Sequence, residues 1–177
     1  WALSSAGDVD GDGLDDIIIG TYSSSFNGGN SGAAYVMLGS TLSSGASTSY
    51  NVWNDADYTM YGSQSDFFAF SVGPAGDFDG DGLDDFVVYS RYTDHGGPDT
   101  GTVYLFSGAS LPYLAANSHI NPETSDYRLT GTTSIGFVNR LSPIPGDLDG
   151  DGFDDILLGS SEANSQQGLV NVFTDCD

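Results

Sequence analysis

The sequence predicts an all-β protein made of three consecutive four-stranded repeats, the last of them incomplete, with the form of β-propeller blades. Three observations indicate this class: an acidic nine-residue pattern occurs three times, an apolar run follows each copy, and helical spacing is nearly absent. The glycines before the three copies, Gly7, Gly76 and Gly146, are spaced 69 and 70 residues apart. Four short antiparallel strands in a unit of about this length are typical of a propeller blade.

We therefore expect a single β-propeller segment over 1–177, divided into repeats at about 1–62, 63–131 and 132–177. The first strand of each repeat enters the acidic loop, and the expected ranges are 1–6, 67–72 and 137–141. The second strand follows the loop as the apolar runs 17–19, 86–88 and 156–158, which do not alternate with polar residues. Runs of this kind favour strands that are buried on both faces.

The third strand of each repeat begins after a glycine, and the expected ranges are 33–38, 102–106 and 169–173. Fourth strands are expected over 57–62 and 126–131, and the third repeat stops before one. The Ser-rich stretches 23–31 and 41–49 are expected to be loops between strands. A weak helical spacing over 110–117 is also expected to be a loop.

The acidic pattern reads DVDGDGLDD from Asp8, DFDGDGLDD from Asp77 and DLDGDGFDD from Asp147. Carboxylates at its first, third, fifth and ninth positions converge if the loop curls, and hard oxygen ligands in that number suit Ca²⁺. The glycines between them tolerate the positive φ angles of a tight loop. A merely solvated acidic turn is the alternative. Three copies with one spacing favour metal binding, because clustered carboxylates repel one another without a cation.

We predict three Ca²⁺ sites, one per repeat, each with four aspartates and, by analogy with the EF-hand, one backbone carbonyl from Leu14, Leu83 or Phe153. The predicted ligands are Asp8, Asp10, Asp12, Leu14 and Asp16; Asp77, Asp79, Asp81, Leu83 and Asp85; and Asp147, Asp149, Asp151, Phe153 and Asp155. An EF-hand itself is not expected, since the last acid comes at the ninth position and no helix follows. The acids at the eighth position, Asp15, Asp84 and Asp154, are expected to point away and bond nearby backbone.

The 177 residues suffice for a core of ordinary size, but the charge balance is extreme. Asp and Glu number 25 against three arginines and no lysine, for a formal charge of −22. Three Ca²⁺ ions would leave the chain strongly acidic, which excludes nucleic acid and anionic membranes as partners. Protein or glycan ligands are the partners expected.

The compartment expected is extracellular, secreted or at the cell surface. Calcium near 0.1–1 mM, on the order that weak sites need, is found outside cells. No apolar run is long enough for membrane insertion, and no signal segment precedes Trp1, so a signal is expected to have been removed. Cys176 is the single cysteine, so it is a free thiol or pairs with a segment or chain beyond this sequence.

The second repeat closely resembles the FG-GAP repeat family, the calcium-loop blades of integrin α-subunit propellers and of many secreted microbial proteins. It reads FAFSVGPAGD from Phe68 into its acidic loop and later GTVYLF from Gly101, and Ala69 alone replaces a family glycine. The third repeat departs from the family, because its Phe-Gly element is scrambled over 136–139. In the first repeat, the Phe-Gly pair would fall before Trp1.

The resemblance implies a propeller of about seven blades, of which this chain would be a part, completed by further blades from the same or another chain. The function expected is an adhesion or binding scaffold, with Ca²⁺ stabilising the blade loops and no catalysis. Two alternatives remain: part of a secreted enzyme acting on polysaccharide, or a structural subunit of a surface filament. The acid/base candidates for an enzyme, which belong to no motif, are His95, His119, Glu123 and Glu162.

The aromatic residues are expected to pack mainly between blades rather than to form a glycan platform. Tyr35 and Tyr104 occupy equivalent strand positions, as do Met37, Phe106 and Phe173, which favours a role in the core. The aromatics in the connectors are the better candidates for contact with a partner, namely Tyr50, Trp53 and Tyr92.

Overall fold

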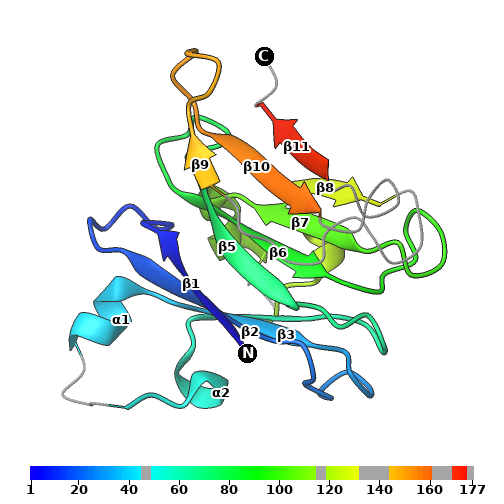
Figure 1. Ribbon diagram of the computed structural model, residues 1–177. Helices are drawn as coiled ribbons and strands as arrows, with labels where there is room; N and C mark the ends of the chain where they lie inside the picture. The colour runs from blue at the N-terminus through cyan, green and yellow to red at the C-terminus, as the bar shows by residue number, and fades with distance from the viewer. Residues whose placement is uncertain (45–48, 115–118, 132–143, 161–168, 175–177) are drawn as a thin grey trace.

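Three antiparallel sheets lie side by side in the computed structural model, which describes residues 1–44, 49–114, 119–131, 144–160 and 169–174. Figure 1 shows the three acidic loops on one side of the molecule, each between the first and second strands of its sheet. Strands adjacent in sequence are hydrogen-bonded neighbours in every sheet. This arrangement confirms the predicted all-β class and matches consecutive propeller blades.

The strands follow the predicted order. The first sheet contains β1 (Ala2–Gly7), β2 (Asp16–Thr21), β3 (Ala33–Met37) and β4 (Tyr58–Tyr61). The second sheet contains β5 (Ser71–Gly76), β6 (Asp85–Ser90), β7 (Thr102–Phe106) and β8 (Tyr127–Thr130). The described strands of the third sheet are β9 (Ile144–Gly146), β10 (Asp155–Ser160) and β11 (Leu169–Phe173).

The register repeats from the first sheet to the second. Ile18 pairs with Val36, and their equivalents 69 residues later, Val87 and Leu105, pair with each other. A register shift occurs at the end of β1, between Ser5 and Gly7, and another at the end of β5, between Pro74 and Gly76. These shifts lie where the chain leaves the ladder, so the acidic loop begins at the same place in both sheets.

The strand that enters the second loop was predicted over 67–72, but β5 begins at Ser71. The preceding residues turn instead, because Phe67 and Ala69 have positive φ angles of 51° and 56°, which a strand cannot contain. Phe68 makes an isolated parallel bridge to Gly32 of the first repeat. The strand predicted over 137–141 lies outside the described residues, as do Phe137 and the scrambled element at 136–139.

Short helices occur where the sequence predicted loops, and this part of the prediction was wrong. The connector between β3 and β4 forms α1 (Gly39–Ser44) and α2 (Val52–Asp55), and the connector after β7 forms a 3₁₀ turn (Gly108–Ser110) and α3 (Leu111–Leu114). The Asn51 side chain caps α2 by accepting from Trp53 N. A second 3₁₀ turn, Pro122–Thr124, precedes β8.

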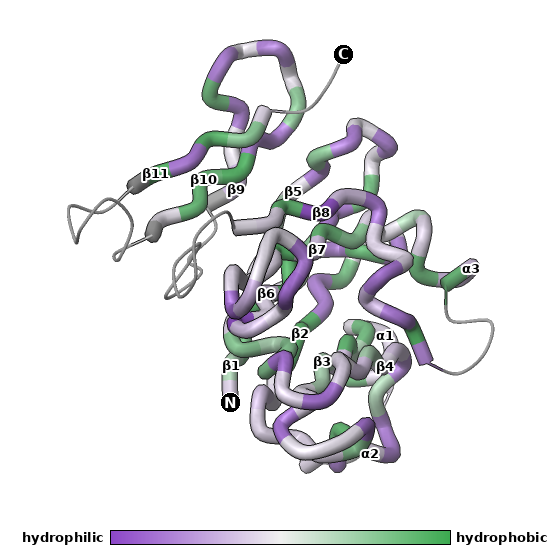
Figure 2. Tube along the Cα trace, turned by 90° about the vertical axis from the view of Figure 1, so that its right-hand side faces the viewer, coloured by the Kyte–Doolittle hydropathy of each residue, from purple (hydrophilic) through white to green (hydrophobic). Residues whose placement is uncertain are grey.

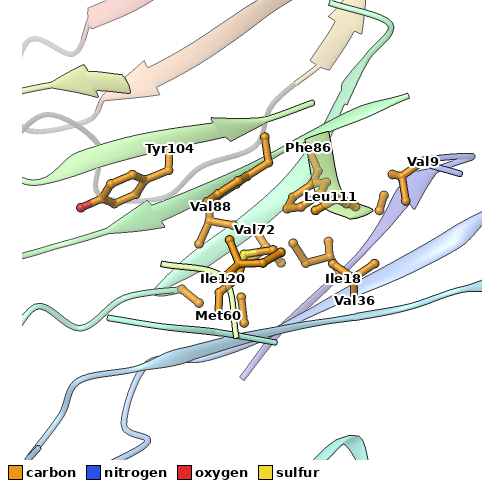
Figure 3. Packing of buried hydrophobic residues seen from close by; sticks show 14 of the residues in the cluster. Val9, Ile18, Val36, Met60, Val72, Phe86, Val88, Tyr104, Leu111 and Ile120 are labelled. Carbon is orange, nitrogen blue, oxygen red and sulfur yellow. The ribbon is translucent and has the colours of Figure 1, made fainter. Parts of the chain in front are cut away.

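The core lies between the sheets. Figure 3 shows Ile18, Val36 and Met60 of the first sheet packed against Val72 and Phe86 of the second. A second cluster joins the opposite face of the second sheet to Ile156 and Leu158 of β10. Figure 2 shows the apolar stretches along β2, β7 and β10, with the hydrophilic residues concentrated in the loops. The predicted burial of β6 on both faces is confirmed, because all six of its residues are buried.

The outer face of the first sheet is covered by its own β3–β4 connector. Leu42 of α1 and Val52 of α2 pack against buried Tyr35 and Met37. The predicted burial of Tyr35, Tyr104, Met37 and Phe106 is confirmed, since all four are at most 2% exposed. Tyr104 and Phe106 pack between the first two sheets as predicted, whereas Tyr35 and Met37 pack against the connector of their own sheet. Among the described residues, no helix is both long and apolar enough to span a bilayer.

Candidate metal centre

Each acidic loop is organised by its first aspartate. In the first loop, Asp8 Oδ1 accepts hydrogen bonds from the backbone N–H groups of Gly11 (2.8 Å) and Asp12 (3.0 Å), and its Oδ2 accepts from Gly13 N (2.9 Å). Gly11 and Gly13 have φ angles of 75° and 87°, which lets the chain curl around the carboxylate. The loop is therefore preformed around its own acid.

The same bonds recur one and two repeats later. Asp77 Oδ2 accepts from Gly82 N, and Asp147 Oδ2 accepts from Gly152 N, both at 3.1 Å. The carboxylate at the third position accepts from the N–H at the fifth in every loop, at 3.1 to 3.2 Å. The carboxylate at the fifth position accepts from the N–H at the seventh, at 2.8 to 2.9 Å. The three loops thus share most of one hydrogen-bond pattern, and the second loop differs in that Asp77 Oδ1 accepts no hydrogen bond.

Three carboxylates converge in each loop. One oxygen from each of the three acids lies within 4.8 Å of the other two, and the groups are Asp8, Asp10 and Asp16; Asp77, Asp79 and Asp81; and Asp147, Asp149 and Asp155. The structure therefore brings together nine of the twelve predicted aspartates. The other three, Asp12, Asp85 and Asp151, belong to the same loops but lie outside these groups.

The aspartate at the ninth position is buried in all three repeats and ties strands together. Asp16 Oδ2 accepts from Val9 N (2.8 Å) and Oδ1 from Gly39 N (2.7 Å). Asp85 likewise accepts from Phe78 N and Gly108 N, at 2.9 and 3.1 Å. In the first two repeats, each carboxylate joins its own loop to the residues after the third strand, and Asp155 accepts from Leu148 N of its own loop. The sequence predicted a ligand here, and this bracing function was not predicted.

Burial and neighbouring acids oppose ionisation of these groups. Burial raises the pKa of Asp85 to about 7, and the charges of Asp79 and Asp81 add to the rise. Burial also raises the pKa values of Asp16 and Asp79. A cation beside these carboxylates would favour their charged forms and reverse these rises.

The arrangement fits a hard divalent cation. Asp77 Oδ1 is buried and accepts no hydrogen bond, so the second loop contains a carboxylate oxygen that lacks a partner. Asp155 Oδ1 is also buried and unbonded. In the first two repeats the corresponding oxygen accepts from Gly39 N or Gly108 N, and the residue at that position in the third repeat, Asp175, lies outside the described residues. Carboxylate oxygens without a competing nitrogen or sulfur ligand are the donor set that Ca²⁺ prefers.

Two of the three eighth-position aspartates bond backbone, as predicted, but it is the backbone of the preceding repeat. Asp84 Oδ2 accepts from Asp8 N at 2.8 Å, and Asp84 N donates to Asp8 O at 3.1 Å. Asp154 makes the same two bonds to Asp77, at 3.3 and 3.2 Å. The three loops are thus joined in series.

A pocket of about 410 Å³ lies between the first two sheets, at the end of the strands opposite the acidic loops. Phe26 and Tyr61 stack on one wall with ring centroids 4.2 Å apart, and His119 meets Tyr61 edge-on. Asp66 and Glu123 supply carboxylates to the lining. The sequence did not predict this pocket, because its residues come from three connectors and two strands that are separate in the sequence.

Three of the four acid/base candidates lie in or beside this pocket. His95 Nε2 lies 2.9 Å from Glu123 Oε2, and Arg128 also pairs with Glu123. His119 Nδ1 lies 2.8 Å from Thr59 Oγ1. Glu162 and Cys176 lie outside the described residues. Of the connector aromatics, Trp53 is 51% exposed and packs edge-on against Phe26, whereas Tyr50 and Tyr92 are partly buried.

Tandem four-stranded blades with an acidic loop between the first two strands define the class of protein. A sequence model of the FG-GAP repeat family matches residues 1–37, 68–106 and 141–173. These segments make up more than half of the chain, and the chain belongs to the FG-GAP repeat family. The resemblance inferred from the second repeat is confirmed in all three.

Integrin alpha-PS2 of Drosophila melanogaster is similar to this chain. The two are 29% identical over 170 residues, an alignment that covers 86% of this chain and 11% of the relative. The chain therefore spans about a tenth of that relative's length.

Proposed function

We propose that this chain is a calcium-binding blade segment of an extracellular β-propeller that acts as an adhesion or binding scaffold. Calcium fixes the loops on one rim, and connectors on the opposite rim meet a protein or glycan partner. The observation that carries the proposal is the threefold recurrence of one preformed loop with converging carboxylates. FG-GAP membership and similarity to an integrin alpha subunit support the adhesion role.

The calcium proposal covers all fifteen predicted ligands. Because the carboxylates at positions one, three and five already accept backbone N–H bonds, calcium would use their remaining lone pairs. The carbonyl oxygens of Leu14, Leu83 and Phe153 remain predicted ligands, and so does the ninth-position aspartate of each loop.

Native mass spectrometry of the chain before and after chelation tests this proposal. We expect three Ca²⁺ per chain, removed by a chelator and restored by added calcium. A chain that carries no metal at millimolar calcium and stays folded in chelator would contradict it.

The pocket between the first two sheets is the proposed place of partner contact. Its aromatic wall offers apolar area, while Asp66, Glu123 and the Tyr104 hydroxyl offer hydrogen-bonding groups. A mixed lining of this kind, in a concave site of a few hundred Å³, is typical of ligand sites. Substitution of Tyr61 by Ala should weaken capture of a protein or glycan partner, whereas the same change at Tyr113, which is exposed and does not line the pocket, should not.

Further blades are the second proposed partner. Leu3 is 71% exposed, yet its equivalent one repeat later, Val72, is 6% exposed and packs against the first sheet. Val170 and Val172 of β11 are 62% and 52% exposed. Their equivalents in the second sheet, Val103 and Leu105, are buried against the third sheet. Leu3, Val170 and Val172 are thus exposed where the matching side chains of the second sheet are buried by a neighbour, and a blade from the same or another chain would cover them.

We favour a non-catalytic scaffold over an enzyme because of the contacts that Glu123 makes. Its carboxylate is paired with Arg128 and His95, and these pairs favour the ionised form, which cannot act as a general acid. A filament subunit would use the same open faces between copies of the chain. Sedimentation across a concentration series tests the filament alternative. A filament subunit should self-associate as the concentration rises, and the Leu3→Asp substitution should prevent this self-association.

A further inference from the structure

Adjacent acidic loops make a repeated contact with each other. Asp84, at the eighth position of the second loop, both accepts from Asp8 N and donates its own N–H to Asp8 O. Asp154 repeats both bonds to Asp77. The main chain of the first-position aspartate is therefore fixed at both of its polar groups by the following blade. Because the contact occurs twice across different neighbours, it is a property of the repeat.

Side-chain packing reinforces these bonds. A Cβ on Gly7 would lie 2.3 Å from Asp84 Oδ2, and one on Gly76 would lie 1.9 Å from Asp154 Oδ2. A Cβ on Gly11 would lie 2.8 Å from the Leu83 side chain. The glycines around the first-position aspartate leave the space into which the next blade inserts its seventh and eighth residues.

The fixed residue is also the centre of its own loop. Asp8 accepts hydrogen bonds from three backbone N–H groups of the loop, and its carboxylate is one of the three that converge. A displacement of the Asp8 main chain would therefore move the carboxylate around which the loop is wound. Asp84, which is not among the predicted metal ligands, controls that position from 76 residues away.

We propose that Asp84 and Asp154 are positioning residues that couple neighbouring calcium sites, so that each loop binds calcium in full strength only when the following blade is docked on it. The inference rests on the proposed calcium function and adds an order of dependence among the three loops. The first loop depends on the second blade, and the second loop depends on the third. Calcium in one loop in turn stabilises the contact with the following blade, because coupling between two equilibria is reciprocal.

The test is the calcium affinity of each loop in the full chain, read from the backbone amide signals of Gly11, Gly80 and Gly150 during an NMR titration. In the Asp84→Asn variant, we expect the first loop to bind calcium about tenfold more weakly, because the charge-assisted hydrogen bond from Asp8 N becomes a weaker bond to a neutral amide oxygen. The second loop, which contains residue 84, should stay within about twofold of the wild type, since an eighth-position side chain is outside its ligand set.

Asp15→Asn is the matched control. Asp15 has the same position in the first loop, and its carboxylate is exposed with no hydrogen bond to any of the described residues. We expect all three affinities to be unchanged in this variant. Asp154→Asn should reproduce the tenfold loss, now at the second loop, which would show that the effect moves with the contact.

Three results would overturn the coupling. These are equal weakening of the first and second loops, weakening confined to the second loop, or an Asp84→Asn variant that matches Asp15→Asn. If Asp84→Asn unfolds, Leu83→Ala replaces it, because that change removes only the side chain over Gly11 and should also weaken the first loop. A wild-type chain whose glycine signals do not respond to calcium overturns the calcium function together with the coupling, whereas a normal response with unchanged variants overturns the coupling alone.

Discussion

The ninth-position aspartates brace the strands from buried positions, and burial opposes the charge of their carboxylates. Asp16 and Asp85 are fully buried, and both of their oxygens accept backbone N–H bonds that hold the strands together. Burial of a carboxylate is costly unless it is paired, and these bonds offset the cost only in part, as the raised pKa of Asp85 shows. A bound cation would supply the missing compensation.

Substitution of Asp79 by Ala should remove calcium from the second loop alone. Asp79 is one of three converging carboxylates, and each loop supplies its own ligands. We expect the stoichiometry to fall from three Ca²⁺ to two in native mass spectra at a calcium level that saturates the wild type. Asp15→Ala, which removes an acid next to a ligand, should retain three. Loss of all three ions in the Asp79 variant would contradict the assignment of a separate ligand set to each loop.

The stability of the chelated chain should fall as the pH rises from about 4 to about 7. Asp85 has a pKa of about 7 in the folded state against 3.8 in the unfolded state, so the folded state holds this proton more tightly. That contribution is complete below pH 4 and is lost as the pH passes the folded value. Urea unfolding in chelator at several pH values measures it. Asp85→Asn should flatten this dependence, and an equally steep one in the variant would contradict the assignment to Asp85.

At the residue scale, the sequence was sufficient to find the acidic positions but not all of their contacts. Spacing within a loop is local, so Asp8, Asp10 and Asp16 could be placed together from the pattern alone. The bond from Asp84 to Asp8 crosses 76 residues, and periodicity does not reveal which face of one repeat meets the next. The pairing of the eighth position with the preceding loop therefore required the structure.

At the element scale, the junction between the first two sheets depends on a close backbone approach. Gly32 has a φ of 78°, and a Cβ there would lie 2.0 Å from the Phe68 carbonyl oxygen. Gly32 O accepts from Gly62 N, and Phe68 N donates to Ser31 O. This contact explains why residues 67–70 turn rather than form the strand that the sequence predicted.

Gly32→Ala should destabilise the chain by more than about 2 kcal/mol, because the new methyl group meets backbone atoms and the φ angle disfavours any other residue. Gly29→Ala is the control, since no atom lies within 4 Å of its added Cβ and its φ is not positive. We expect the control to stay within about 1 kcal/mol of the wild type. Chemical unfolding measures both. Equal effects would mean that the close approach has no energetic weight.

The connector helices escaped prediction because tertiary bonds rather than sequence periodicity hold them. Asp57, just before β4, accepts from Leu38 N and from the Thr41 hydroxyl, both at 2.8 Å, and so fixes the start of α1. Asp126 makes equivalent bonds to Ser107 N and the Ser110 hydroxyl one repeat later. One-turn helices of this kind carry almost no amphipathic signal.

At the scale of the whole molecule, the apolar cores and the charge act against each other. The sheets pack face to face through buried clusters, but 25 acids oppose three arginines, and the densest acidity lies on one rim. Net charge of this size destabilises a compact state through self-repulsion. This self-repulsion can be reduced by general screening by salt or by specific binding of cations at the loops, and an experiment can distinguish the two.

Chelation should lower the melting temperature of the chain by more than about 10 °C, as expected when several sites lose a ligand that only the folded state binds. Calcium chloride should restore the melting temperature fully. Sodium chloride at equal ionic strength should not, because screening at that strength hardly weakens the repulsion between carboxylates of the same loop. Sodium chloride near 1 M, where the Debye length is about 3 Å, should restore part of the loss. Scanning calorimetry of the chelated chain, alone and with each of the three salt additions, measures the difference. If sodium chloride at equal ionic strength restored stability as well as calcium did, the rim would be a screened acidic surface, and the loops would not be metal sites.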